Sequence, residues 1–100
     1  MSSFIDKTNS DIPTLVDFFA HWCGPCKTMM PVLDELKNKL GDKINILKVD
    51  VDKNANAAQK YKIMGVPTFI LFQQGKIKWK QAGTFSLAQL ESIVKENTTK

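Results

Sequence analysis

The sequence predicts one α/β domain over residues 1–100, with a mixed sheet of about four strands and helices on both faces. Three observations predict this fold. Residues 14–20 form a nearly continuous apolar run rich in β-forming side chains, which is typical of a central strand covered on both faces. From Pro25 onward the apolar residues recur at helical spacing instead. Further strand-like and helix-like segments then alternate, and this order favours a layered sheet with a parallel first crossover.

The first half of the chain contains a weak helix, a strand and a strong helix. Residues 2–12 carry the weak helical signal, with Phe4, Ile5 and Thr8 on one side. Gly41 is a natural end for the strong helix, because glycine readily adopts the positive φ found just beyond many helices. The inward-facing residues expected on that helix are Met29, Leu33, Leu36 and Leu40.

The second half is predicted to add three strands and two helices. Residues 44–51 form a strand, and Asn54 is the expected N-cap of a short helix over 55–61. The strands at 68–72 and 76–82 form a hairpin, in which Ile77 and Trp79 pack inward between exposed lysines. Ser86 and Gln89 match a capping box that opens the last helix.

Composition excludes several classes of function. The chain is 43% hydrophobic and 24% charged, as in ordinary soluble domains, and its formal charge is +4. The basic residues are lysines spread singly, without arginine, so we expect no nucleic-acid binding. No segment resembles a secretory signal or a membrane span, which predicts a cytoplasmic protein that binds no membrane.

The chemistry is expected at the pair Cys23 and Cys26, the only cysteines in the chain. Pro25 favours the first turn of a helix, which places Cys23 at the helix N-terminus. There the unpaired N–H groups and the helix dipole favour a thiolate. We therefore expect Cys23 to attack a disulfide and Cys26, more buried and less acidic, to resolve the intermediate.

A metal site is the alternative interpretation of these cysteines. His21, Cys23 and Cys26 could supply three ligands, but structural zinc takes four and the chain offers no other soft donor. A c-type haem site needs histidine directly after the second cysteine, where Lys27 stands. Redox activity is favoured, and no metal is expected.

Asp17 is the most informative residue outside this pair. A carboxylate in the middle of a strand covered on both faces is costly unless it keeps its proton or finds a partner. The flanking apolar residues Val16 and Phe18 argue against a carboxylate that reaches solvent. We expect desolvation to raise its pKa.

Residues 16–27, with the sequence VDFFAHWCGPCK, resemble the active-site signature of the thioredoxin family. The resemblance continues through Pro31, residues 48–52, residues 65–68 and Gly83, and covers the chain from about Thr14 to its end. It implies a thioredoxin-like fold and a protein-disulfide reductase that passes through a mixed disulfide. It also implies that no prosthetic group is needed, that the partners are disulfide-containing proteins and an external reductase, and that the protein is a monomer.

The resemblance also implies roles for individual residues. Asp17 would lie beneath the resolving cysteine and move its proton, accompanied by Lys48. Pro67 would be cis and pack over the cysteines, while Val66 would offer its backbone to an extended substrate. The active-site and substrate-binding surface would comprise Trp22, Gly24, Pro25, Gly65, Val66, Pro67 and Gly83, with Met64 beside them.

Three departures from the family pattern carry predictions. Only 22 residues precede Cys23, so the first family strand is expected to be missing, which leaves residues 44–51 at a sheet edge. Phe19 stands where the family usually has tryptophan, which changes packing and not chemistry. His21 places a titratable group near Cys23 and is expected to tune its thiolate.

The residues between the cysteines favour a reductant. More oxidising relatives usually carry histidine before the second cysteine, where Pro25 stands here. A binding module that uses the fold without redox turnover is the rival from another class. Replacement of both cysteines by serine separates the two, because a binding module would keep its activity.

Overall fold

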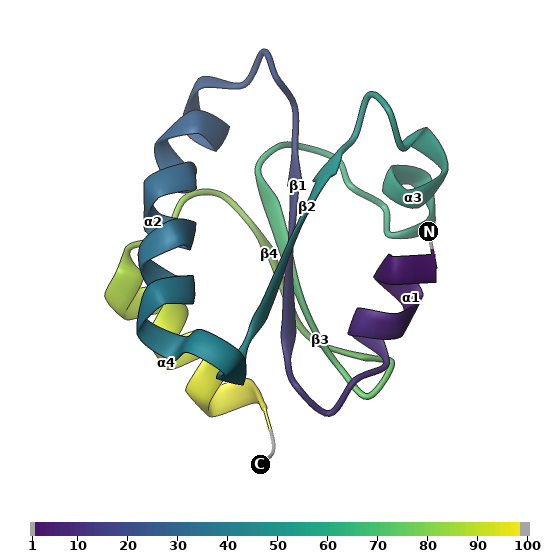
Figure 1. Cartoon of the computed structure of the whole chain (residues 1–100). Coiled ribbons are helices and arrows are strands. Elements are labelled where there is room, and N and C mark those ends of the chain that lie inside the picture. Colours follow the sequence, from purple (N-terminus) through teal and green to yellow (C-terminus); the bar gives the residue numbers. More distant parts are fainter. Residues whose placement is uncertain (1, 99–100) are drawn as a thin grey trace.

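A computed structural model describes residues 2–98 of the chain (Figure 1). Its elements, in chain order, are α1 (Ser2–Thr8), β1 (Thr14–Phe19), α2 (Gly24–Leu40), the 3₁₀ turn η1 (Gly41–Lys43), β2 (Asn45–Asp50), α3 (Ala55–Lys60), β3 (Thr68–Gln73), β4 (Lys76–Ala82) and α4 (Leu87–Asn97). The bounds from β1 onward therefore differ from the sequence-based expectations by only a residue or two, whereas α1 ends four residues before the end of the predicted helical signal at residue 12.

The four strands form one mixed sheet in the order β2-β1-β3-β4. β1 pairs with β2 in parallel, whereas β3 runs antiparallel to both β1 and β4. The predicted four-stranded α/β architecture is confirmed, and so is the position of β2 at a sheet edge. In residues 2–98 no strand precedes β1, because the chain before it forms only the short helix α1.

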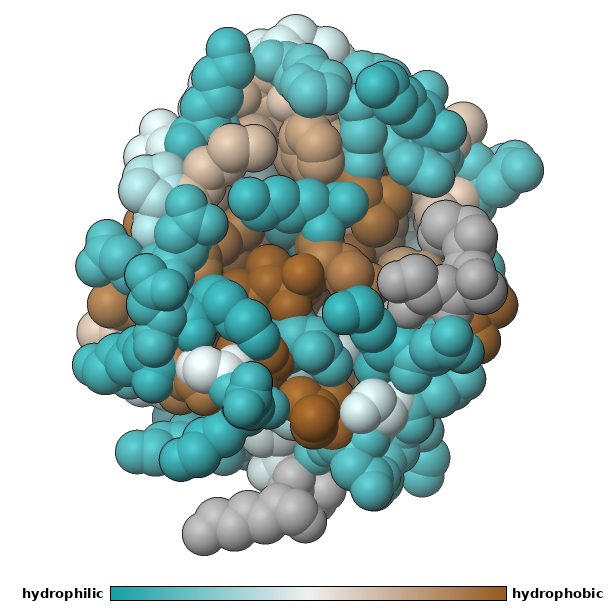
Figure 2. Space-filling model, viewed as in Figure 1, coloured by the Kyte–Doolittle hydropathy of each residue, from teal (hydrophilic) through white to brown (hydrophobic). Residues whose placement is uncertain are grey.

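Helices cover both faces of the sheet, with α2 and α4 on one side and α1 and α3 on the other (Figure 1). The alternation of side chains along β1 supplies both cores: Leu15 packs with α2 and α4, while Val16 and Phe18 pack on the α1 side. Figure 2 shows polar residues over the helices and apolar ones along the middle of the view, over the edge strand β2. That exposure agrees with the half-buried Ile46 and Leu47 of this strand.

Local sequence signals explain how the helices begin and end. Gly41 follows α2 with φ of 56°, and its N–H donates to the Lys37 carbonyl, as expected of a helix end. The capping box of α4 is present, since the Ser86 side chain accepts from the Gln89 N–H and the Gln89 side chain accepts from the Ser86 N–H.

The prediction that Ile77 packs inward was wrong, and the side chains of Ile5 and Asn54 each add one feature that the sequence did not indicate. Ile5 lies on the same side of α1 as Phe4 and Thr8, as predicted, and all three line one hollow, but the Ile5 side chain is 54% exposed. Ile77 is 51% exposed, because β4 is an edge strand whose register with β3 shifts beside it. Asn54 is the N-cap residue of α3, as predicted, but its side chain makes no capping hydrogen bond, and its Nδ2 donates to the Asp50 carbonyl.

None of the helices within residues 2–98 is long and apolar enough to cross a membrane.

Candidate active site

Cys23 and Cys26 form a disulfide at the N-terminus of α2, with Cα atoms 5.3 Å apart. Cys23 is the N-cap residue, and its Sγ accepts a hydrogen bond of 3.1 Å from the Cys26 N–H. Pro25 lies in the first turn, as predicted. The helix therefore directs its unpaired N–H groups toward Cys23, which stabilises a thiolate on that sulfur once the disulfide is reduced.

The disulfide sits in a small apolar cluster at the end of β1. Ala20 belongs to this cluster, and Phe19, Val51 and Val66 pack against it. Both cysteines are buried, with 4% of Cys23 and 2% of Cys26 exposed. Cys26 is thus slightly more buried than Cys23, as predicted. The main difference between the two sulfurs is that Cys23 occupies the N-cap position.

Two loops complete the surroundings of the cysteines. The Val66–Pro67 peptide bond is cis, as the family resemblance implied, and Cys23 Sγ lies 3.7 Å from the Val66 carbonyl oxygen. Gly83 has φ of 116° and donates its N–H to the Pro67 carbonyl at 2.9 Å, so the loop after β4 is tied to this turn. Thr68 Oγ1 donates to the Gly65 carbonyl and so links the residues on either side of the Val66–Pro67 bond.

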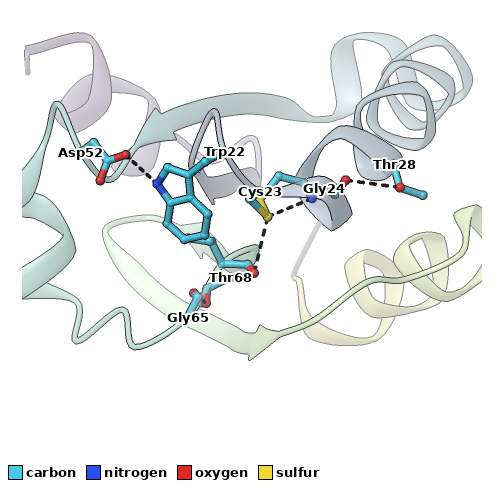
Figure 3. Close-up of a disulfide and its surroundings, with 9 residues drawn as sticks. Trp22, Cys23, Gly24, Thr28, Asp52, Gly65 and Thr68 are labelled. Carbon is cyan, nitrogen blue, oxygen red and sulfur yellow. Dashed lines mark hydrogen bonds between the residues drawn. A yellow bond between two sulfur atoms is a disulfide. The ribbon is translucent and has the colours of Figure 1, made fainter.

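An exposed surface surrounds the buried cysteines. Trp22 is 71% exposed and Met64 is 95% exposed, which confirms that both lie on the surface and not in the core. Gly24, Pro25 and Gly65 are also exposed, whereas Val66 is half-buried and Pro67 is buried. Figure 3 shows the Trp22 indole beside Cys23, with its Nε1 directed at Asp52.

Asp52 is a site residue that sequence reasoning missed. Its Oδ2 accepts a hydrogen bond of 3.0 Å from Trp22 Nε1 and so holds an otherwise exposed indole in place. The parallel pairing of β1 with β2 could have indicated this contact. Because both strands end at the same edge of the sheet, the residues that follow them, Trp22 and Asp52, become neighbours.

The same strand ends bring His21 to Asp50, another residue that sequence reasoning missed. His21 Nε2 lies 3.2 Å from Asp50 Oδ2, while Oδ1 of that carboxylate accepts from the Asp52 N–H at 2.9 Å. The His21 side chain is 72% exposed, but that of Asp50 is only 8% exposed. Asp50 is therefore a buried carboxylate with a partner on each oxygen.

Asp17 lies in the middle of β1 and is completely buried. Neither carboxylate oxygen has a hydrogen-bond partner among residues 2–98. Desolvation raises the pKa of Asp17 to about 6, and the nearby Lys48 ammonium partly offsets that rise. Since alternate residues of a strand share a face, Asp17 lies on the same side of the sheet as Leu15, under α2, the helix that carries Cys26.

Lys48 is paired directly with Asp17 in the register of β1 and β2. It is exposed at the sheet edge, as expected of a lysine on a strand with an open side. Its influence on Asp17 is electrostatic, because it lowers the pKa of the carboxyl without a hydrogen bond to it.

The described residues contain no group of three or more His, Cys, Asp or Glu side chains placed to hold a metal ion. The imidazole of His21 contacts Asp50.

Comparison with known proteins identifies the family. The sequence model of the thioredoxin family matches residues 2–96. A thioredoxin from Acidithiobacillus ferridurans is 40% identical over 89 residues, which are 89% of this chain and 82% of that protein. The chain belongs to the thioredoxin family.

Further thioredoxins agree with this assignment. The chloroplastic thioredoxin Y of Oryza sativa subsp. japonica is 47% identical over 81% of this chain, which spans about half (48%) of that longer protein. The structure of a mutant thioredoxin from Halobacterium salinarum NRC-1 superposes with a TM-score of 0.89 at 31% identity, and covers 100% of this chain and 87% of that one. The fold and the cysteine pair of this thioredoxin-family chain together make it a thiol–disulfide oxidoreductase.

Proposed function

We propose that the protein is a protein-disulfide reductase that works through a mixed disulfide. The reduced Cys23 thiolate attacks one sulfur of a client disulfide, forms a Cys23–client bond and expels the other client sulfur as a thiolate. The Cys26 thiolate then attacks Cys23 Sγ and expels the second client sulfur. The client gains two electrons, and the protein is left with the Cys23–Cys26 disulfide seen in the structure.

Asp17 is proposed to accept the proton that Cys26 must lose before it attacks. Three observations support this role: the carboxylate is buried, it has no hydrogen-bond partner among residues 2–98, and its pKa is raised to about 6. Such a group holds a proton more readily than an exposed aspartate, yet it can release that proton near neutral pH. Lys48 is proposed to stabilise the charged form of Asp17, in line with its effect on that pKa.

Clients are proposed to dock on the exposed surface around the cysteines. The Val66 backbone next to Cys23 Sγ suits an extended client segment that adds main-chain hydrogen bonds, and the Pro67 carbonyl that follows it is held by the Gly83 N–H. The rest of this client-binding surface is Trp22, Gly24, Pro25 and Gly65. Its apolar and glycine-rich character places few restrictions on the client side chains.

The direction of electron flow follows from the residues near the sulfurs. Pro25 precedes Cys26, so no imidazole stabilises the thiolate from that position. His21 is proposed to tune Cys23 only weakly, since its imidazole is exposed and directed at Asp50. Both features favour reduction of clients over oxidation or isomerisation.

The remaining proposals concern partners and compartment. An external reductase must restore the dithiol after each cycle, and no prosthetic group takes part in the scheme. We propose that the protein acts as a cytoplasmic monomer on disulfide-containing proteins, and binds neither nucleic acid nor membrane. Scattered lysines in place of a clustered basic surface support the absence of nucleic-acid binding.

The observation that carries the proposal is the N-cap position of Cys23, because it assigns the attacking role to one sulfur. The test uses reduced Cys26→Ser and Cys23→Ser variants with a protein that contains accessible disulfides. Cys26→Ser should accumulate a mixed disulfide with the client, and Cys23→Ser should not. Equal trapping by both variants would contradict the assignment. Client binding and function retained by the double serine variant would show a binding module instead.

A further inference from the structure

A hollow lies away from the cysteines, between α1 and α3 on the opposite face of the sheet from α2. Its volume is about 790 Å³, within the range typical of small-molecule sites. The residues that line it come from α1, from residues 53–61 and from the end of the β3–β4 hairpin. None of the redox residues described above takes part.

The floor of this α1–α3 cavity is aromatic. The rings of Phe4, Tyr61 and Phe72 contact one another edge-on or tilted, with centroids 5.5–6.0 Å apart. Ile5 forms part of the wall, so this large apolar side chain, 54% exposed, faces a cavity rather than open surface. A floor and wall of this kind gain free energy by covering an apolar body.

The charged side chains on the rim have one sign. Lys53 and Lys60 both line the cavity, and no aspartate or glutamate does so among residues 2–98. Lys60 Nζ lies 5.4 Å from the centroid of the Tyr61 ring, so its ammonium hangs over the aromatic floor. The amides of Asn9 and Asn56 also line the cavity and can donate to an oxyanion.

We propose that the α1–α3 cavity binds a small amphipathic carboxylate, with its apolar body on the aromatic floor and its carboxylate between Lys53 and Lys60. Apolar burial supplies most of the affinity, and the two ammonium groups select the anion over a cation of the same shape. This site is independent of the disulfide chemistry.

The test is an NMR titration of the 100-residue chain with decanoate below its micelle-forming concentration. The proposal predicts saturable shifts centred on Phe4, Ala57 and Tyr61, and clearly weaker binding of decyltrimethylammonium, which has the same apolar body and the opposite charge. Lys53→Gln/Lys60→Gln should bind decanoate about fivefold more weakly, since two exposed charge contacts are lost. The matched control Lys76→Gln/Lys95→Gln carries the same net charge but changes lysines outside the cavity, and should bind as the parent does.

A space-filling variant separates binding in the cavity from attachment elsewhere. Ala57 lines the cavity from α3, so Ala57→Leu should abolish the decanoate shifts while the spectrum keeps the dispersion of a folded protein. If that variant unfolds, the lysine pairs still decide the matter. No shifts at millimolar decanoate, equal binding of the cationic analogue, or equal weakening by both lysine pairs would overturn the proposal.

Discussion

Two buried aspartates one strand apart have opposite surroundings. Asp17, in the middle of β1, has neither oxygen hydrogen-bonded within residues 2–98. Asp50, at the end of the neighbouring β2, binds the Asp52 N–H with one oxygen and His21 with the other. Both are nearly inaccessible to solvent, so position in the sheet and not burial distinguishes them.

The difference shows that the position of a buried carboxylate along its strand determines whether it finds hydrogen-bond partners. A strand end offers loop N–H groups and side chains that satisfy a carboxylate, and Asp50 uses them to hold the loop that carries Trp22. The middle of a central strand offers no such partner, since its backbone groups are already paired with both neighbours. Asp17 is therefore suited to proton transfer, and Asp50 is suited to a structural role.

The largest expected effect is on turnover. Asp17→Asn removes the proposed proton acceptor for Cys26 and should slow resolution of the mixed disulfide by about tenfold or more near pH 7. Stopped-flow measurement of client release checks this, with Asp50→Asn as the matched control. An unchanged rate in Asp17→Asn would remove Asp17 from the mechanism.

The comparison predicts that Asp17→Asn and Asp50→Asn change the free energy of unfolding in opposite directions. Because the pKa of Asp17 in the folded protein is about 6 against 3.8 for the unfolded chain, the folded state binds more protons between these values. The contribution of Asp17 to stability is thus most favourable below about pH 4 and becomes less favourable, by about 3 kcal/mol, as the pH rises through 6. Asp17→Asn should therefore be more stable than the parent at pH 7.5, by about 1–2 kcal/mol once the cost of an unpaired amide is included.

Denaturant titration at two pH values isolates this effect. The stability gained by Asp17→Asn should shrink or vanish at pH 4, where the parent Asp17 is itself neutral. The titration of carboxylates that both proteins contain cancels in the difference between their free energies of unfolding. If Asp17→Asn gained the same stability at both pH values, the gain would come from altered packing and not from removal of the charge.

Asp50→Asn should have the reverse effect, with a smaller size. It weakens the hydrogen bonds to Asp52 and His21, and should cost about 1 kcal/mol at pH 7.5. The rate of client release should stay close to that of the parent. Should this variant gain stability as Asp17→Asn does, the contrast between the two aspartates would be wrong.

The smallest effect is expected at His21. His21→Glu places a negative charge near the disulfide and should raise the pKa of the Cys23 thiol by a few tenths of a unit, since an exposed charge is well screened by water and salt. Thiolate absorbance of the reduced protein measures this pKa. Gln81→Glu, an exposed position on β4, is the control for net charge, and an equal shift in both variants would deny His21 a specific influence.

The redox pair and its neighbours on the chain could be predicted because their signals are local. Each signal acts within one turn of helix: the spacing of the cysteines, Pro25 in the first turn, and Gly41 at the helix end. Asp17 could be predicted because a charge in an apolar strand is anomalous wherever that strand packs. The Asp50–His21 and Asp52–Trp22 contacts were missed because they join residues 29 and 30 positions apart, and only the parallel register of β1 and β2 brings them together.

Side chains at edges were also harder to predict. The alternation along β4 placed Ile77 inside, but an edge strand with a register shift leaves it 51% exposed. Ile5 lies on the predicted side of α1, yet it is 54% exposed. Asn54 stands at the predicted N-cap position, yet in the turn after β2 its side chain is oriented so that Nδ2 donates to the Asp50 carbonyl and no helix N–H is capped. A short-range pattern cannot anticipate which of two competing hydrogen bonds the tertiary structure favours.

The reduction potential of the Cys23–Cys26 pair tests the central claim most directly. It is measured by trapping thiols after equilibration with a series of dithiol redox buffers. A disulfide reductase requires a strongly reducing pair, near the value of about −270 mV known for thioredoxin. A potential near about −180 mV, as known for protein disulfide isomerase, would contradict the account and make disulfide formation or isomerisation the better function.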